Sequence, residues 1–217
     1  GLAMESRRDP KGLAALLREG TREQHRRAER TGFVADLLRG RGARQGYVLL
    51  LRNLLPAYVA LESGLDRHRH APIFAGVAWP ALFRAGPLAR DLDALAGADW
   101  PDRIALLPEG ERYVQRVVAA GEGRGERLLA HAYTRYLGDL SGGQIIGRII
   151  GESLGPDIET LAFHRFPAIE DPDAFRQGFR RALDAATALV DSAAVLDEAV
   201  AAFELNIALS EAVQRRS

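Results

Sequence analysis

Apolar residues recur every three or four positions along most of the chain, which is the spacing of one face of an α-helix. The first such face runs from Leu13 through His25 to Ala28 and ends at Thr31-Gly32. No segment alternates apolar and polar residues over the length of a strand. The sequence therefore predicts an all-α fold, a bundle of roughly seven to nine helices around one core. The same spacing predicts the further helices over residues 33–38, 47–65, 88–95, 108–120, 128–154, 174–190 and 193–213.

Proline and glycine mark the expected interruptions of these helices. Pro56 lies inside the predicted helix 47–65, where we expect a kink. Residues 71–87 are rich in proline and glycine and are predicted to form a loop. Shorter breaks are predicted at residues 121–125 and 167–172.

The length of 217 residues corresponds to about one domain. We expect residues 11–217 to form that domain and residues 1–10 to be disordered, with the three residues before Met4 interpreted as a tag remnant. No apolar run approaches the ~18 residues that cross a bilayer, so we expect a cytoplasmic protein without a membrane anchor.

Composition excludes several classes of protein. The chain has 29 basic and 29 acidic residues, so net charge gives no reason to expect binding to nucleic acid or a membrane surface. It has no cysteine, which excludes disulfides, thiolate metal sites and cysteine nucleophiles. Lys11 is the only lysine, and with the abundant alanine and glycine this favours a GC-rich bacterial source.

Four glycines interrupt the predicted helix 128–154 and need an explanation. Gly138 and Gly142 share one helix face, and Gly143 and Gly147 share another. Each glycine costs about 1 kcal/mol relative to alanine inside a helix. The pattern fits either tight packing of a neighbouring segment or a flat ligand lying on the helix. Asp139 and Ser141 stand among these glycines.

The second unusual feature is His25 on the apolar face of the first helix. A histidine there is either a satisfied core residue or a ligand. Glu29 lies one turn later, where its carboxylate could orient the imidazole as it does for metal-bound histidines. Arg18 and Arg22 precede it near the same face and could meet the carboxylates of a ligand. The remaining histidines give weaker signals: His131 is interpreted as structural, His68 and His70 as exposed, and His164 has no obvious partner.

Together these two regions resemble the heme oxygenase family. The run HAYTRYLGDLSGGQ over residues 131–144 is similar to that family's distal helix almost throughout. The run LREGTREQH over residues 17–25, followed by Glu29, is similar to its proximal helix. Weaker similarity extends the resemblance from about Leu13 to Val213. It implies that heme lies between the two helices.

The resemblance also implies a role for individual residues. On the proximal side, His25 matches the iron ligand and Glu29 the nearby carboxylate. On the distal side, Asp139 matches the carboxylate that holds a water network where oxygen binds. The distal backbone is matched by Gly138, Gly142 and Gly143, and the network positions by Tyr58, Arg135 and Asn206. Residues expected at the propionates are Arg18, Arg22, Tyr133, Arg176 and Arg180, and further heme contacts are expected from Thr134, Ser141 and Phe203.

Heme b is then both cofactor and substrate, and O₂ is the co-substrate. The products are biliverdin, carbon monoxide and ferrous iron. The chain has no flavin, nicotinamide or iron–sulfur fingerprint, so electrons must come from an external ferredoxin or flavin reductase. We expect a monomer or a weak dimer.

Three other interpretations stay open from the residues themselves. A heme carrier or sensor would keep His25 but could lack Asp139 and the glycines. A non-heme di-iron bundle would need paired Glu-x-x-His motifs, which do not occur in this sequence. A purely structural helical bundle would not bind heme.

Overall fold

The computed structural model describes residues 12–155 and 161–217, and these residues form helices and connecting loops without a strand. The all-α prediction is confirmed over those ranges. The expectation for residues 1–10 lies outside them. The described α-helices are α2 (Leu13–Gly20), α3 (Arg22–Arg30), α4 (Gly32–Leu38), α5 (Arg44–Arg67), α6 (Ala85–Ala96), α7 (Trp100–Arg103), α8 (Pro108–Ala120), α9 (Leu128–Ala132), α10 (Gly138–Leu154), α11 (Pro172–Ala186) and α12 (Ser192–Arg216).

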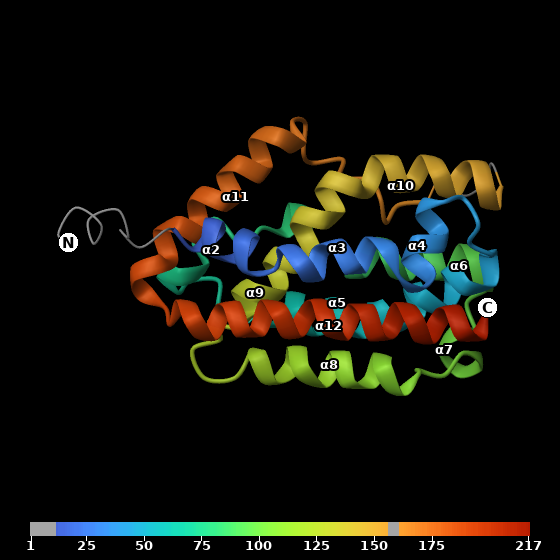
Figure 1. The fold of residues 1–217 in the computed structure, drawn as a ribbon, viewed down its shortest axis with the longest axis horizontal. Coiled ribbons are helices and arrows are strands. Elements are labelled where there is room, and N and C mark those ends of the chain that lie inside the picture. Colours follow the sequence, from blue (N-terminus) through green and yellow to red (C-terminus); the bar gives the residue numbers. More distant parts are fainter. Residues whose placement is uncertain (1–11, 156–160) are drawn as a thin grey trace.

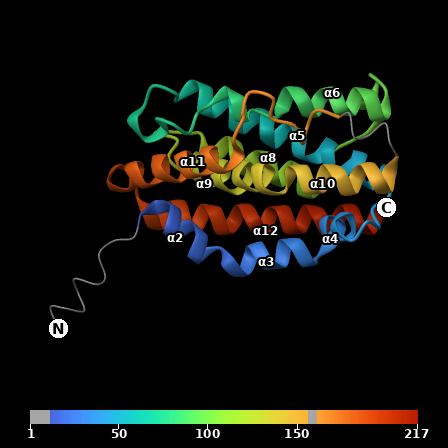
Figure 2. The same cartoon turned by 90° about the horizontal axis from the view of Figure 1, so that it is seen from above.

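Helix α12 runs along the molecule and contacts much of the fold (Figure 1). Helices α2, α3 and α4 follow one another along one side of it, while α5, α8 and α9 pack on it elsewhere (Figure 2). Helix α11 packs on α2 at one end of the bundle, and α10 packs on α4 at the other end. The core is one cluster of leucines, aromatic residues and alanines from these helices.

The first predicted helix is wrong in one respect, because the structure divides it at Thr21. The hydroxyl of Thr21 donates to the carbonyl oxygen of Leu17 at 2.6 Å, and its backbone leaves helical geometry. Such back-bonding by threonine competes with regular helix geometry. The resulting α3 carries no fully buried side chain. The ion pair of Arg27 with Glu204, at 2.7 Å, joins α3 to α12.

Residues 71–87 were predicted as a loop, but α6 already begins at Ala85. The carboxylate of Glu62, on α5, accepts the backbone N–H groups of Arg84 and Ala85 at 2.7 and 2.9 Å. A buried acceptor at this end satisfies donors that a helix start leaves free. Pro87 is tolerated in the first turn of α6, because a backbone N–H there would have no acceptor within the helix. Short 3₁₀ turns at Pro72–Phe74 and Pro80–Leu82 occupy the rest of the segment.

The predicted helix 128–154 is also divided, into α9, a π-helical segment over Tyr133–Leu137, and α10. These divisions and the short α7 explain why the described residues hold more helices than the predicted seven to nine. The prediction for 108–120 matches α8 at both ends. Residues 174–190 resolve into α11, which starts at Pro172, and a 3₁₀ turn over Thr187–Leu189.

Helix α5 continues through Pro56 without a break in its helical assignment. By length and composition alone it could cross a membrane, and it is the one described helix that passes this test. However, 67% of its most apolar window is buried inside the protein. This burial is what a core helix of a bundle shows.

Glu198 joins three helices through a buried ion cluster. Its carboxylate, 1% exposed, pairs with His131 of α9 at 2.7 Å and with Arg116 of α8 at 2.9 Å. Burial alone would raise the pKa of Glu198, but the hydrogen bonds from His131 and Arg116 outweigh it and hold that pKa at about 2. His131 thus lies in the core, in the structural role that the sequence suggested.

We expect Glu198→Gln to lower the free energy of unfolding at pH 7 by about 3 kcal/mol, because it leaves the Arg116 guanidinium without its counter-charge and the buried His131 ring without its carboxylate partner. The folded-state pKa lies below the ordinary 4.5, so this contribution is present above pH 4.5 and is lost as the pH falls toward 2. Urea unfolding of wild type and variant between pH 7 and pH 3 measures the difference.

Glu204→Gln is the matched control, since Glu204 also pairs with an arginine but is 45% exposed. Its loss should stay below about 1 kcal/mol. Equal losses in the two variants would contradict the importance of the buried cluster.

Candidate functional site

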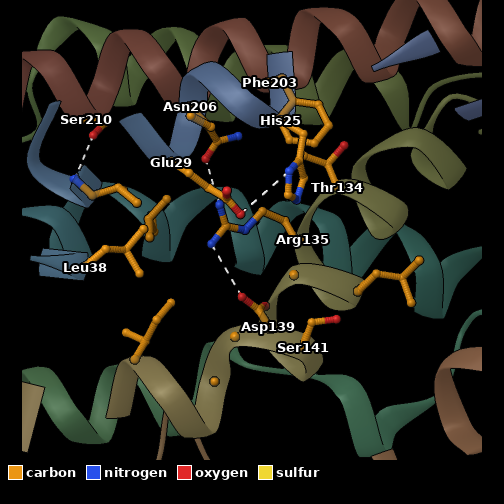
Figure 3. Close-up of a pocket in the computed structure, with 18 of the residues that line it drawn as sticks. His25, Glu29, Leu38, Thr134, Arg135, Asp139, Ser141, Phe203, Asn206 and Ser210 are labelled. Atoms are coloured by element: carbon orange, nitrogen blue, oxygen red, sulfur yellow. Dashed lines mark hydrogen bonds and ion pairs between the residues drawn. The ribbon is translucent and has the colours of Figure 1, made fainter. Parts of the chain in front are cut away.

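A cavity of about 950 Å³ lies between α2 and α3 on one side and α10 on the other. Pockets of ~300–1,000 Å³ typically hold small-molecule ligands. Figure 3 shows His25 and Glu29 on one side of it, facing Asp139 and Ser141 on the other. Its walls are mostly apolar, and the apolar lining is Ala28, Val34, Leu37, Leu38, Leu50, Leu51, Leu54, Leu137, Ile145, Ile146, Phe163, Phe203 and Ile207.

His25 is presented to the cavity by the start of α3. Its backbone N–H donates to Thr21 at 2.9 Å, across the break between α2 and α3. The ring packs edge-on against Phe203, with centroids 5.8 Å apart. Its Nδ1 lies 3.7 Å from a carboxylate oxygen of Glu29, a distance for an ion pair or a water-bridged contact rather than a direct hydrogen bond. This arrangement places Nε2 on the edge of the ring away from Glu29.

A hydrogen-bond network runs from Asp139, on the opposite side of the cavity, through Arg135 to Asn206. The hydroxyl of Tyr58 donates to Asp139 at 2.6 Å, and the Nε of Arg135 donates to the same hydroxyl at 2.9 Å. Arg135 also donates to the side-chain oxygen of Asn206 at 2.7 Å, and its remaining nitrogen lies 3.7 Å from Asp139. The network therefore draws on α5, the π segment, α10 and α12.

Within this network the positive charge of Arg135 offsets the negative charge of Asp139. Burial raises the pKa of Asp139, while the charge of Arg135 and the hydrogen bond from Tyr58 oppose that rise. Burial also raises the pKa of Tyr58, so this hydroxyl keeps its proton. Burial opposes the charge of Arg135, but Tyr58, Tyr113 and Asp139 raise the pKa of its guanidinium, which stays protonated.

The glycines of α10 serve two different purposes. A Cβ placed on Gly138 would meet nothing within 4 Å, so this residue opens onto the cavity. A Cβ on Gly143 would lie 3.3 Å from the backbone oxygen of His164, and one on Gly147 would lie 3.4 Å from its Cβ. The pair 143 and 147 therefore permits close packing of a loop, while Gly138 leaves room for a ligand. The packing interpretation of the glycine pattern holds for Gly143 and Gly147, and the open space at Gly138 is what the ligand interpretation requires.

The loop that packs on those glycines is held by two buried ionic side chains. The guanidinium of Arg84, 3% exposed, donates to the carbonyl oxygens of Phe163 and Arg165 at 3.0 and 2.6 Å. The carboxylate of Asp91 accepts the backbone N–H of Phe163 at 2.7 Å. The loop brings Phe163 and His164 to the cavity wall.

His164 has a partner that the sequence did not reveal. Its Nε2 lies 2.9 Å from the hydroxyl oxygen of Tyr47, near the start of α5. Burial lowers the pKa of His164 to about 4, and the charge of Arg84 adds to the effect, so the imidazole is neutral at neutral pH. Spacing along the chain gave no signal for this pair, because the two residues lie 117 positions apart.

Three arginines border the cavity where α2, α3 and α11 meet. Arg18, Arg22 and Arg180 line it and are exposed, as carboxylate-binding groups at a pocket entrance must be. Tyr133 also lines the cavity, and burial raises the pKa of its hydroxyl.

Two of the residues that the sequence singled out do not line the cavity. Arg176 is paired with Asp173 on its own helix instead of facing the cavity. Tyr58 lies behind the wall, 1% exposed, and reaches the site through Asp139. The singled-out residues that do line the cavity are Arg18, Arg22, His25, Glu29, Tyr133, Thr134, Arg135, Gly138, Asp139, Ser141, Gly142, Gly143, Arg180, Phe203 and Asn206.

Within the described ranges, no group of three or more histidine, aspartate or glutamate side chains is arranged to hold a metal ion. His25 by itself offers a single imidazole. A metal bound to it needs most of its ligands from elsewhere, as the four nitrogens of a porphyrin supply them. This favours a heme site over a di-iron site.

Comparison with known proteins gives one consistent result. A family model described as heme oxygenase matches residues 11–212. The chain is 40% identical to a heme oxygenase of Takifugu rubripes, over 97% of this chain and 76% of that protein. It is 38% identical to heme oxygenase 1 of Nostoc sp., over 93% of this chain and 86% of that one.

The solved structure of heme oxygenase-1 from the cyanobacterium Synechocystis sp., in complex with heme, superposes with a TM-score of 0.87. The identity is 34%, and the match covers 95% of this chain and 94% of that one. The structure of heme oxygenase from Leptospira interrogans gives a TM-score of 0.86 at 33% identity, covering 93% of this chain and all of that one. The sequence match, the fold and the facing of His25 and Gly138 agree, and this chain belongs to the heme oxygenase family.

Proposed function

We propose that this chain opens heme to biliverdin, carbon monoxide and ferrous iron, with O₂ as co-substrate. The observation that carries the proposal is a cavity with an imidazole on one side and a helix without side chains at Gly138 on the other. A planar ligand with a metal at its centre fits between them. Asp139, at which the polar network begins, lies on the side opposite His25 (Figure 3).

The residues present fit heme in each of its parts. Nε2 of His25 would bind the iron, with Glu29 orienting the ring. Arg18, Arg22 and Arg180 would hold the propionates, for which planar guanidinium groups are well suited. Phe203, Thr134 and the backbone at Gly142 and Gly143 would contact the faces, together with Ser141 and Tyr133.

Heme, when bound, supplies the iron at which oxygen reacts and the carbon that is oxidised. The residues of the chain hold the heme in place and supply the protons for the reaction. The hydroxyl of Tyr58 donates a hydrogen bond to one oxygen of Asp139, which leaves the other oxygen to accept from water in the cavity. Arg135 and Asn206 keep Tyr58 and Asp139 in place. A water molecule held by this carboxylate would be a weaker proton donor than an acidic side chain in direct contact with the ligand.

Several further features belong to the same proposal. Electrons come from an external donor, a ferredoxin or a flavin reductase, and the exposed Arg18 and Arg22 would attract an acidic one. The protein acts in the bacterial cytoplasm as a monomer or weak dimer. Arg176 lies one helical turn before Arg180 on α11 and would meet the propionates or the donor only on leaving Asp173.

A heme carrier or sensor without ring opening is the competing function. Mixing the purified protein with heme and a reductant in air separates the two. Ring opening requires decay of the Soret band and appearance of biliverdin absorbance. A stable Soret band under these conditions would favour the carrier.

We expect His25→Ala to lose the spectrum of an axial imidazole, because the cavity offers no other imidazole on that side. Absorbance of the heme complex, before and after imidazole is added, measures the loss and its rescue. His70→Ala, at an exposed position, is the control and should keep the wild-type spectrum. An unchanged spectrum in His25→Ala would place the ligand elsewhere.

We expect Asp139→Ala to bind heme but to form biliverdin about 10²-fold more slowly, because the ordered proton source is gone. The reaction should be diverted to peroxidase-like oxidation of an added reductant. Product analysis after aerobic turnover measures both. Asp197→Ala, on the exposed face of α12, should behave as wild type. Normal biliverdin yield in Asp139→Ala would refute the role of this carboxylate.

We expect Gly138→Ala to stabilise the apoprotein by up to about 1 kcal/mol, since alanine favours the helix and its methyl group meets no neighbour. The same methyl group would enter the ligand space and slow ring opening. Urea unfolding and single-turnover kinetics measure the two effects. Gly178→Ala, inside α11 and away from the cavity, should bring the stability gain alone. Slower turnover in both variants would point to a cause other than ligand space.

A further inference from the structure

The pair formed by Tyr47 and His164 is a polar feature that the proposed mechanism does not use. Both residues line the cavity, and their rings stack with centroids 6.3 Å apart and 27° between planes. Phe163 packs edge-on against His164, with ring centroids 4.8 Å apart, and the other residues of α5 that line the cavity are Leu50, Leu51 and Leu54. Polar groups in an apolar wall are costly unless they bond to each other or to a ligand.

Contacts from several elements hold His164 in this position. Arg84 and Asp91 hold the backbone on either side of it, and Arg84 also lies over the ring of Phe166 at 3.9 Å. Gly143 and Gly147 let the loop approach α10. The imidazole therefore has a fixed place at the cavity wall.

Counting hydrogens shows that the pair has a donor to spare. A tyrosine hydroxyl and a neutral imidazole carry one polar hydrogen each, and their mutual bond uses one. If Tyr47 donates to Nε2, the Nδ1–H of His164 is left. If Nε2–H donates to Tyr47, the tyrosine O–H is left. In either tautomer, one hydrogen remains for an acceptor.

The position of the pair indicates which part of a ligand it would meet. Tyr47 and Tyr58 lie on one face of α5 and are separated by about 16 Å along the helix axis. Tyr47 thus lies toward the end of the cavity formed by α4 and its residues Leu37 and Leu38. The arginines lie toward the opposite end, where α2 meets α11 (Figure 1).

A porphyrin held by its propionates at the arginines turns its opposite edge toward Tyr47 and His164. In heme this edge carries only methyl, vinyl and C–H groups, which accept no hydrogen bond. Ring opening at that edge replaces one C–H by two lactam carbonyl groups, which do accept hydrogen bonds. The donor left over in the pair would therefore find an acceptor in the product and none in the substrate.

We propose that Tyr47 and His164 form a product-recognition site, which binds a lactam oxygen of an open-chain tetrapyrrole at the edge remote from its propionates. This inference rests on the proposed function. It assigns the pair to product affinity and release, separate from the proton network at Asp139.

The test uses the double variant Tyr47→Phe/His164→Phe, which keeps two stacked rings and removes the polar atoms from both partners. Replacing both partners of a buried hydrogen bond by apolar groups of similar shape is often tolerated. Binding of biliverdin IXα is followed by quenching of tryptophan fluorescence, and binding of heme by its Soret absorbance, both without reductant. Thermal unfolding of the apoprotein checks that the variant is folded.

We expect the Kd for biliverdin IXα to rise about fivefold, the value of one ordinary hydrogen bond, while the Kd for heme changes less than twofold. Tyr47→Phe alone serves if the double variant does not fold, and it should show the smaller change in the same direction. An unchanged Kd for biliverdin, or equal weakening of both ligands, would overturn the proposal. Neither result depends on turnover, so loss of ring opening in wild type would count against the proposed function alone.

Discussion

The half-buried guanidinium of Arg135 is the group on which the polar side of the cavity depends. It reaches Tyr58 on α5, Asp139 on α10 and Asn206 on α12, so one side chain ties three helices together. Its charge also lies 4.9 Å above the ring of Tyr58. Without this cation, the carboxylate of Asp139 would be buried with only a tyrosine hydroxyl as partner, and its charged form would be strongly disfavoured.

The π segment explains how Arg135 can make these contacts from within a helix. Five residues, Tyr133–Leu137, widen the helix immediately before Gly138. Such bulges are rare and occur often at functional sites. Here the irregular turn and the adjoining glycine meet at the ligand space, so the helix loses regular geometry at the point where it must both approach a ligand and hold a charge beside it.

Much of the fold could be predicted from the sequence, since amphipathic periodicity identified most helices, and α8 to the residue. Its failures have local causes. The break at Thr21 arises from a side-chain bond to the preceding turn, and the early start of α6 from Glu62, which lies 22 residues before it. Neither contact leaves a mark on hydrophobic spacing. Regular spacing also could not reveal the π segment.

The site was predictable where chemistry and sequence spacing coincide. His25 with Glu29, and Arg135 with Asp139, are each one helical turn apart. Tyr58 and Asn206 were assigned only through resemblance, because their contacts cross the fold. Tyr47 and His164 were missed, since nothing in either segment indicates the other.

The lack of fully buried side chains in α3 has a consequence for how the two sides of the cavity are held. The distal side belongs to the core, but α3 rests on its neighbours through half-buried residues and the Arg27–Glu204 pair. Segments with few buried contacts open locally at low free-energy cost. A bond from His25 to iron would join this loosely held helix to the rest of the protein through the ligand itself. Binding of heme would then complete the tertiary structure on this side of the cavity, and loss of the iron would return α3 to its looser state.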